Sequence, residues 1–415
     1  MNEEVIVHGV EWTVKELFVY PNEFIYWSIQ IVMYPYMTGL VAGAFVLSSL
    51  YHVFGQKDLK EIAQFSLVFS LALLPVAALP LLLHLQQPTR AMEPLLTPHF
   101  TSAIAAFGIV FTAYALIVLS EIWFVYRAYF VAQVSELRGK PGFWNRTRRI
   151  AYQLLTIGAH DVGSSALKVD RKAATVMAAI GIPVACFLHG YAGFIFGSVK
   201  ANALWMSPLM PVIFIMSAVV SGIALCMLTY IMIMEWQAFR QRRRGGAVEA
   251  SQTKGAEADV ITKSTRYLLG FLIAAISLEL LDLIFRGYTA MKSLDILRSV
   301  MYGKYFMNIF VLQYTLGNLV PFVLLILPGR TVKRTVLALL LVLFGVFMMR
   351  WNVVIGGQAF SLSFSGYMHY EIPLVPHSLE TFKEGLFGAL TVIITPFVLF
   401  WIINKFVPSL NRKAS

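Results

Sequence analysis

Residues 189–226 read HGYAGFIFGSVKANALWMSPLMPVIFIMSAVVSGIALC. This stretch holds the end of one apolar helix, a short hinge with Asn202 and Trp205, and a second apolar helix that opens near Pro208 and Pro211. The beginning of the second helix, MSAVVSGIAL from residue 216, lines up with MTGLVAGAFVL from residue 37. The alignment predicts two copies of one helical unit, joined at the hinge.

The composition identifies the class of protein. Of 415 residues, 58% are hydrophobic and only 13% are charged, which no water-soluble core can accommodate. A helix needs about 20 apolar residues to cross the hydrocarbon layer of a bilayer. Continuous rather than alternating apolar runs favour helices over a barrel. The sequence predicts an all-α, polytopic membrane protein with nine spans at 24–50, 62–86, 102–126, 173–197, 208–236, 267–287, 305–327, 335–352 and 386–404.

The net charge of +11 follows the predicted topology and does not indicate a nucleic-acid partner. The loops 51–61, 127–172, 237–266 and 328–334, together with the C-terminal tail, carry 24 of the 33 Lys and Arg residues. Cytoplasmic loops of membrane proteins are enriched in these residues. The pattern predicts an N-terminus outside and a cytoplasmic C-terminus. It also favours a positive-inside loop at 127–172 over a specific docking surface, with an interfacial helix near 150–157.

Neither cysteine indicates a disulfide or a metal site. Cys186 and Cys226 stand alone in apolar helices, where a small buried packing role is expected. The sequence contains no CxxCH haem-attachment motif and no cysteine cluster. Residues 1–23 are acidic and do not resemble a cleavable signal peptide, so the first span is expected to serve as the insertion signal.

Polar residues in the outer half of the first four spans form one candidate site. Gln30 and Tyr34 are four residues apart and share a helix face. His84 ends the second span, in which Pro75 and Pro80 predict a kink. His189 and Tyr191 lie in the outer part of the fourth span, at a depth comparable to that of His84.

Three interpretations of the two histidines remain open. Histidines on neighbouring helices can ligate a haem, or donate a hydrogen bond to a quinone carbonyl and pass protons. Each can also bond a backbone carbonyl or water near the headgroups. A haem-binding bundle usually has facing mid-membrane histidines and room-making glycines, whereas this chain offers only the outer pair His84 and His189, which disfavours haem.

Acidic residues within the spans form a second candidate set. Glu279, Asp282 and Arg286 are spaced three and four apart and share one face of the sixth span. A structural ion pair and a proton pathway are both open, because charges at this depth are costly unless paired or hydrated. Glu121, in the third span, is a candidate for linking the outer site to the cytoplasmic side.

The order of HGYAGFIFG, ALWMSPLMPVIFIMSAVVSG and RWNVVIGGQ, with the early TGLVAGAFVLSSL, resembles the NrfD/PsrC family of polysulfide-reductase-type membrane subunits. The resemblance implies two four-helix bundles related by duplication, with about one extra span. It also implies menaquinone or another quinone as substrate in the first bundle near the outer face, and no haem or iron-sulfur cluster in this chain. Where some relatives place a histidine in the first span this chain has Tyr34, so His189 is the better match for a quinone ligand.

The predicted function is a quinone-interacting membrane subunit of a respiratory oxidoreductase complex in the inner (cytoplasmic) membrane. The implied partners are an iron-sulfur subunit on the outer face, a multihaem cytochrome c or molybdopterin-type subunit, and membrane lipid. The alternative is a secondary transporter with parallel repeats. The predicted units are an N-terminal outer segment (1–23), a first bundle with the quinone site (24–197), a second bundle (198–358), and an outer loop, last span and tail (359–415).

Overall fold

The computed structural model describes residues 6–7, 10–11, 24–99, 101–200, 202, 204–243, 247–288, 297–298, 300–329, 331–360 and 367–409. Within these residues, nine helical segments are long and apolar enough to cross a membrane. They cover Ile29–His52, Lys57–His84, Ala105–Glu136, Ser164–Gly197, Met210–Arg240, Ala258–Tyr288, Met307–Ile326, Val332–Gln358 and Leu386–Ile403. Each predicted span overlaps one of these segments, so the all-α polytopic fold is confirmed.

Six spans consist of one continuous helix each, and three are composite. The continuous helices are α1 (Ile29–His52), α5 (Ala103–Glu136), α7 (Ser164–Gly197), α8 (Met210–Arg243), α9 (Ala247–Tyr288) and α14 (Leu386–Ile403). The composite spans are η1 (Lys57–Leu59) with α2 (Lys60–Ala77) and α3 (Leu79–His84), the π-helical η4 (Met307–Leu319) with α11 (Val320–Ile326), and α12 (Val332–Val354) with η5 (Gly356–Gln358).

Short elements connect the spans. They are η2 (Pro88–Arg90), α4 (Glu93–Leu96), α6 (Phe143–Leu155), η3 (Val300–Lys304) and α13 (Leu379–Glu384). In the predicted N-terminal outer segment, the structure describes only the antiparallel strands β1 (Ile6–Val7) and β2 (Val10–Glu11), and the remainder of residues 1–23 lies outside the described residues.

The predicted proline kink in the second span is confirmed. Helix α2 ends at Ala77, two residues after Pro75, and α3 begins at Leu79 with Pro80 in its first turn. Proline lacks the amide hydrogen that continues the helical hydrogen-bond ladder, and its ring crowds the preceding turn. The break brings His84 to the end of a separate short helix.

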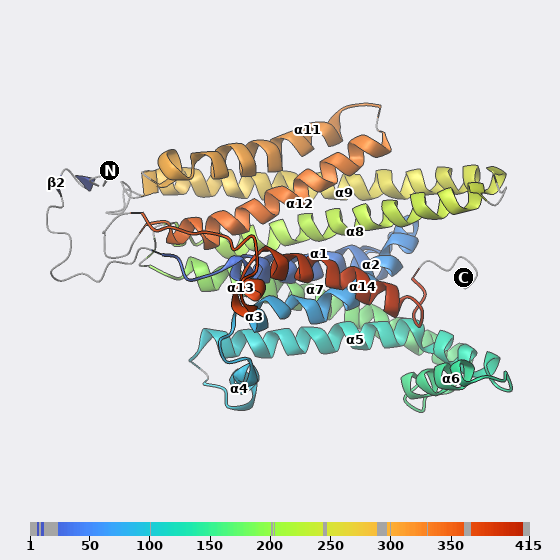
Figure 1. Ribbon diagram of the computed structural model, residues 1–415. Helices are drawn as coiled ribbons and strands as arrows, with labels where there is room; N and C mark the ends of the chain where they lie inside the picture. Colours follow the sequence, from blue (N-terminus) through green and yellow to red (C-terminus); the bar gives the residue numbers. More distant parts are fainter. Residues whose placement is uncertain are drawn as a thin grey trace.

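Two groups of helices pack against each other through α1 and α8 (Figure 1). Helix α1 packs on α2 and α7, and α5 packs on α7, which together form the first group. Helix α8 packs on α9 and α12, and η4 packs on α12, which form the second. The remaining span, α14, lies against α2. These contacts are those expected of two four-helix bundles with one extra span.

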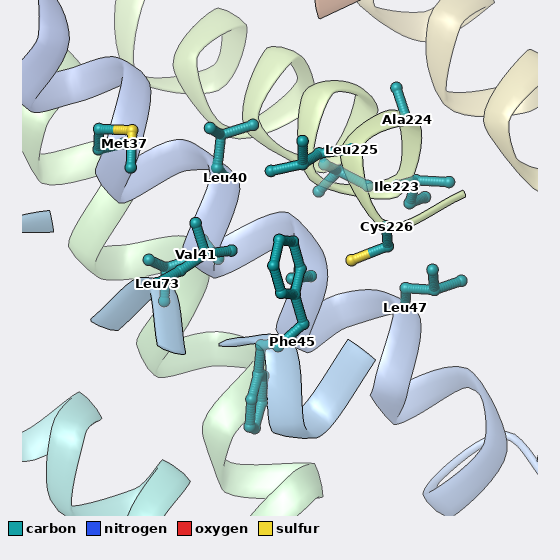
Figure 2. Close-up of a cluster of buried hydrophobic side chains, with 14 of the residues drawn as sticks. Met37, Leu40, Val41, Phe45, Leu47, Leu73, Ile223, Ala224, Leu225 and Cys226 are labelled. Carbon is teal, nitrogen blue, oxygen red and sulfur yellow. The ribbon is translucent and has the colours of Figure 1, made fainter. Parts of the chain in front are cut away.

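Helices α1 and α8 approach closely because glycine and alanine line their contact. A Cβ atom on Gly43 would meet the Ala218 carbonyl oxygen and the Gly222 backbone, and one on Gly222 would meet the Gly43 backbone. Small residues allow such close backbone approach between membrane helices. Around the contact, side chains from both helices form a buried apolar cluster that includes Phe45 and Cys226 (Figure 2). Cys226 is a buried free thiol, as predicted, whereas the same prediction is wrong for Cys186, which is only half-buried.

We expect Gly43→Ala to lower the free energy of unfolding by about 1–3 kcal/mol, since the added methyl group overpacks a backbone contact. The matched control is Gly270→Ala on α9, where an added Cβ meets nothing within 4 Å. Alanine is the better helix former, so the control is expected to be neutral or slightly stabilising. Thermal unfolding of both variants in mild detergent measures the difference. Equal melting temperatures would contradict the importance of the α1–α8 contact.

Candidate functional site

His189 lies on α7 and is buried where the two bundles meet. Three glycines on α7 let that helix approach the start of α8. A Cβ on Gly193 would meet the Met210 carbonyl oxygen at 2.8 Å, and one on Gly197 would meet the Ser207 carbonyl oxygen at 2.7 Å. A Cβ on Gly190, one turn before Gly193, would meet the Ile215 side chain at 2.9 Å. The glycine-rich HGYAGFIFG segment therefore holds the imidazole against α8.

The main partner of His189 is Arg350 of α12. Arg350 is fully buried, and its Nη2 lies 2.9 Å from His189 Nε2 and donates to Ser217 Oγ at 2.8 Å. Its guanidinium carbon stands 3.7 Å from the centroid of the Phe214 ring, a cation–π distance. None of the carboxylates that the structure describes forms an ion pair with Arg350. The positive charge is therefore stabilised by dipoles and an aromatic face.

The Arg350 contact determines which ring nitrogen of His189 carries the proton. A guanidinium has only donors, so Nε2 must accept and the hydrogen of the neutral ring must sit on Nδ1. Among the described residues, Nδ1 is buried and has no hydrogen-bond partner. His189 thus presents one free N–H donor inside the protein.

Gln30 and His84 meet at a second cluster, beside the short helix α13. His84 Nδ1 lies 2.9 Å from the Glu384 carboxylate and 3.3 Å from Ser28 Oγ. Gln30 Nε2 donates to the Lys383 carbonyl oxygen at 2.6 Å, and its buried Oε1 has no partner in the described part of the chain. His84 and Glu384 are partly exposed, so this imidazole–carboxylate pair connects buried groups to solvent.

The two tyrosines of the predicted site have aromatic neighbours. Tyr34 is buried, with its ring edge-on to Phe107 at 5.3 Å. Tyr191 is half-buried between Phe187 and Phe194, at 5.9 and 5.5 Å. The structure therefore brings Gln30 and His84 together, while His189 has other partners. No hydrogen bond joins the two histidines in the described residues.

Glu279, Asp282 and Arg286 border one cavity of about 70 Å³ in the second bundle. Glu279 accepts hydrogen bonds from Gln313 and Asn318, each at 3.0 Å. Asp282 accepts from Arg286 Nε at 2.7 Å and also from the Ser207 hydroxyl. The cavity is large enough for water, which needs only about 10–15 Å³ of this kind of space. Polar side chains from α9, η4 and α12 therefore border a space that water can enter.

The family model for polysulphide reductase NrfD matches residues 20–362. The chain belongs to the NrfD family. The match begins just before α1 and continues through η5, so it includes the clusters around His189 and Glu279.

Two curated relatives of this NrfD chain carry names of reductase subunits. One, a selenate reductase subunit of Mesobacillus selenatarsenatis, is 32% identical over 210 residues, covering 49% of this chain and 47% of the relative. The other, a putative dimethyl sulfoxide reductase membrane subunit of Halobacterium salinarum, is 28% identical over 220 residues, covering 52% and 46%. The NrfD chain thus spans about half the length of the curated relatives it matches.

Glu121 of the NrfD chain has no hydrogen bond to the residues around His189, to those beside α13 or to those around Glu279 among the described residues. Its side chain is fully buried on α5, and neither carboxyl oxygen has a hydrogen-bond partner among the described residues. A buried carboxyl group without a partner is costly, and such groups in membrane proteins are commonly functional.

Three residues around His189 were not predicted from the sequence: Arg350, Phe214 and Ser217. Arg350 had a usable signal, since a charge near the end of an apolar span marks either an interface or a functional group. The partnership itself had no local signal, because Arg350 and His189 are 161 residues apart. Phe214 and Ser217 look like ordinary packing residues of an apolar helix.

The Arg350–Ser217 bond predicts energetic coupling in the NrfD chain. Arg350→Met and Ser217→Ala together should show a coupling free energy of about 0.5–2 kcal/mol, because the hydrogen bond is charge-assisted and buried. Ser66→Ala is the matched control, since Ser66 donates to its own helix at the Ile62 carbonyl oxygen. It should combine additively with Arg350→Met. Unfolding free energies of the single and double variants in detergent measure both couplings, and additive Ser217 and Arg350 effects would contradict the bond.

Proposed function

We propose that this chain is the membrane subunit of a respiratory reductase complex and exchanges electrons and protons with a membrane quinone, menaquinone in the first instance. Membership of the NrfD family and the reductase names of the two relatives support this proposal. A quinone takes up two electrons and two protons when it is reduced. The site must therefore offer hydrogen bonds to the headgroup oxygens and a route for protons.

The free donor of His189 is the single observation that carries the proposal. A quinone carbonyl oxygen is an acceptor, and Nδ1–H of His189 is a buried donor without a partner in the described residues. Arg350 holds the other ring nitrogen at 2.9 Å and so fixes the tautomer that can donate. In this role His189 binds and orients the headgroup through the hydrogen bond that its Nδ1–H donates to the carbonyl oxygen.

The cluster beside α13 is suited to exchanging protons with the outer side. In the proposal, Gln30 offers its unpartnered Oε1 to a quinol hydroxyl, and the His84–Glu384 pair carries the proton to solvent. Tyr34 and Tyr191 contribute aromatic walls in this proposal, Tyr34 beside a ring of α5 and Tyr191 between two rings of its own helix α7.

Partners supply the electrons in this proposal. We place an iron-sulfur subunit on the outer face, linked to a molybdopterin-type or multihaem cytochrome subunit. The family resemblance implies these partners, and the relatives are themselves named as one subunit of a reductase.

We further propose a proton pathway through the buried acids. Glu121 would connect the first bundle to the cytoplasmic side, because its carboxyl group has no other described partner. Glu279, Asp282 and Arg286 would hold protons in the second bundle next to the water-sized cavity. The first bundle is proposed as residues 24–197 and the second as 198–358. The distribution of Lys and Arg supports an inner-membrane location with the N-terminus outside and the C-terminus in the cytoplasm.

The test is quinol turnover by the complex that co-purifies with the chain. Loss of a buried donor that touches the reacting headgroup should lower the rate by about a hundredfold in His189→Ala. His99→Ala is the matched control, since His99 is exposed in the loop before α5 and should leave the rate unchanged.

Mass spectrometry of the purified complex and the melting temperature of each variant establish that the complex remains assembled. Undiminished turnover in an intact His189→Ala complex would overturn the assignment of His189. A chain that purifies without redox partners and binds no quinone would overturn the proposed function and favour a transporter.

A further inference from the structure

Helix α6 has an apolar face that the rest of the described chain leaves uncovered. Phe143, Trp144 and Leu154 of α6, and Ile157 two residues beyond its end, are 74–75% exposed, and Ile150 is 48% exposed. Phe143, Ile150 and Leu154 are spaced seven and four apart, so they form one stripe along the helix. So much exposed apolar surface on one short helix indicates a contact with something other than water.

Arginines border the stripe on both sides. On the helix, Arg146 lies at one edge of the stripe and Arg148 lies beyond Trp144 at the other, and both are exposed. The sequence of α6, FWNRTRRIAYQLL, contains no acidic residue. Amphipathic helices with basic residues flanking a Phe, Trp and Leu face are typical of helices that lie on membrane surfaces.

The opposite face of α6 is fixed to the spans. Tyr152 is fully buried, stacks near Phe130 of α5 at 6.2 Å, and donates its hydroxyl to the Phe406 carbonyl oxygen at 3.3 Å. Trp123 of α5 donates to the Leu155 carbonyl oxygen at 2.9 Å. These contacts orient the helix so that the apolar stripe points away from the bundle.

The end of helix α14 indicates where the hydrocarbon layer of the membrane ends relative to α6. It has 18 residues, or about 27 Å at 1.5 Å per residue, close to the thickness of the hydrocarbon layer. Just beyond its end at Ile403, Lys405 stands over the Trp401 ring, a pairing suited to the interface. Phe406, the residue that Tyr152 contacts, follows directly, so α6 lies where the hydrocarbon ends. Figure 1 shows α6 beside the end of α5 on that side of the molecule.

A turn and a buried ion pair hold α6 in this position. The turn before it contains Gly139 and Gly142, with φ of 84° and 116°, a region that favours glycine. After it, Arg127 pairs with Asp170 at 2.6 Å and donates to the carbonyl oxygen of Ala159, which ties the connection between α6 and α7 to α5.

From this geometry we propose that α6 is a membrane-surface helix that inserts its apolar stripe between the acyl chains and binds anionic lipid headgroups through Arg146 and Arg148. An anionic bilayer matches both features at once, because it offers apolar depth next to negative charge. A docked protein would need an acidic rim around an apolar patch to match the same surface, and the position of α6 at the membrane boundary favours lipid.

The test is hydrogen exchange of segment 143–157 in the full chain with its co-purifying partners, reconstituted in nanodiscs. Discs of phosphatidylcholine alone are compared with discs containing phosphatidylglycerol. We expect exchange to slow by about tenfold in the anionic discs, because attraction to negative headgroups adds to apolar insertion. The double variant Arg146→Gln with Arg148→Gln should lose this difference.

The matched control removes two exposed charges at the opposite end of the spans, with Arg90→Gln and Lys200→Gln. It should keep the full lipid dependence. The four substituted side chains are exposed, so the variants are expected to fold. Hydrogen exchange of α1 and α8 in the same experiment checks this. Equal exchange of α6 in the two lipids, or protection that appears only with a protein partner, would overturn the proposal.

Discussion

The close contact between α1 and α8 is the constraint on which the rest of the structure depends. Gly43 and Gly222 leave no room for a side chain between the two backbones, so the helices pack at a separation that larger residues would prevent. Helix α7 approaches α8 by the same means, through Gly193 and Gly197. Because lipid supplies no hydrophobic force between helices, close van der Waals packing of this kind must hold the bundles together. The buried imidazole of His189 lies between these two contacts.

The repeat predicted from the sequence agrees with the residues that meet at this contact. Aligning residue 37 with residue 216 makes Gly43 equivalent to Gly222 and Gly39 equivalent to Ala218, and both pairs are in contact. Equivalent positions of two related units touch each other only near the axis that relates them. His189 of the fourth span and Arg350 of the eighth span are also in contact. This pair joins an imidazole from the first predicted unit to a guanidinium from the second.

The sequence predicted features that depend on neighbouring residues. The nine spans, the break between Pro75 and Pro80, and the shared face of Glu279, Asp282 and Arg286 all follow from composition or helical spacing. It did not predict that Glu384 would pair with His84, because the two are 300 residues apart. Nor did it predict that Arg350 would orient His189, since no helical period links the fourth and eighth spans. Pairings of this kind depend on how helices pack, and a single sequence contains that information only indirectly.

Hydrogen bonds within the fold satisfy many of the buried polar groups in the described spans. Most buried hydroxyls in the spans are satisfied within their own helix, as Thr38, Ser49 and Ser66 are by carbonyl oxygens one turn earlier. The amides around Glu279 satisfy that carboxylate as well. Native proteins rarely leave a buried polar atom without a partner, so each such atom needs an explanation.

Several of the atoms left without a described partner belong to Gln30, Glu121 and His189. The sequence alone marks these three residues as candidates for the site. A buried polar group with a purely structural role is expected to have hydrogen-bond partners within the fold, as Glu279 does. A role in binding a substrate or moving protons requires a donor or acceptor that the fold itself leaves free. On the proposed function, the quinone headgroup or water is the partner of these atoms, and the contact with Arg350 at 2.9 Å holds the imidazole of His189 in place.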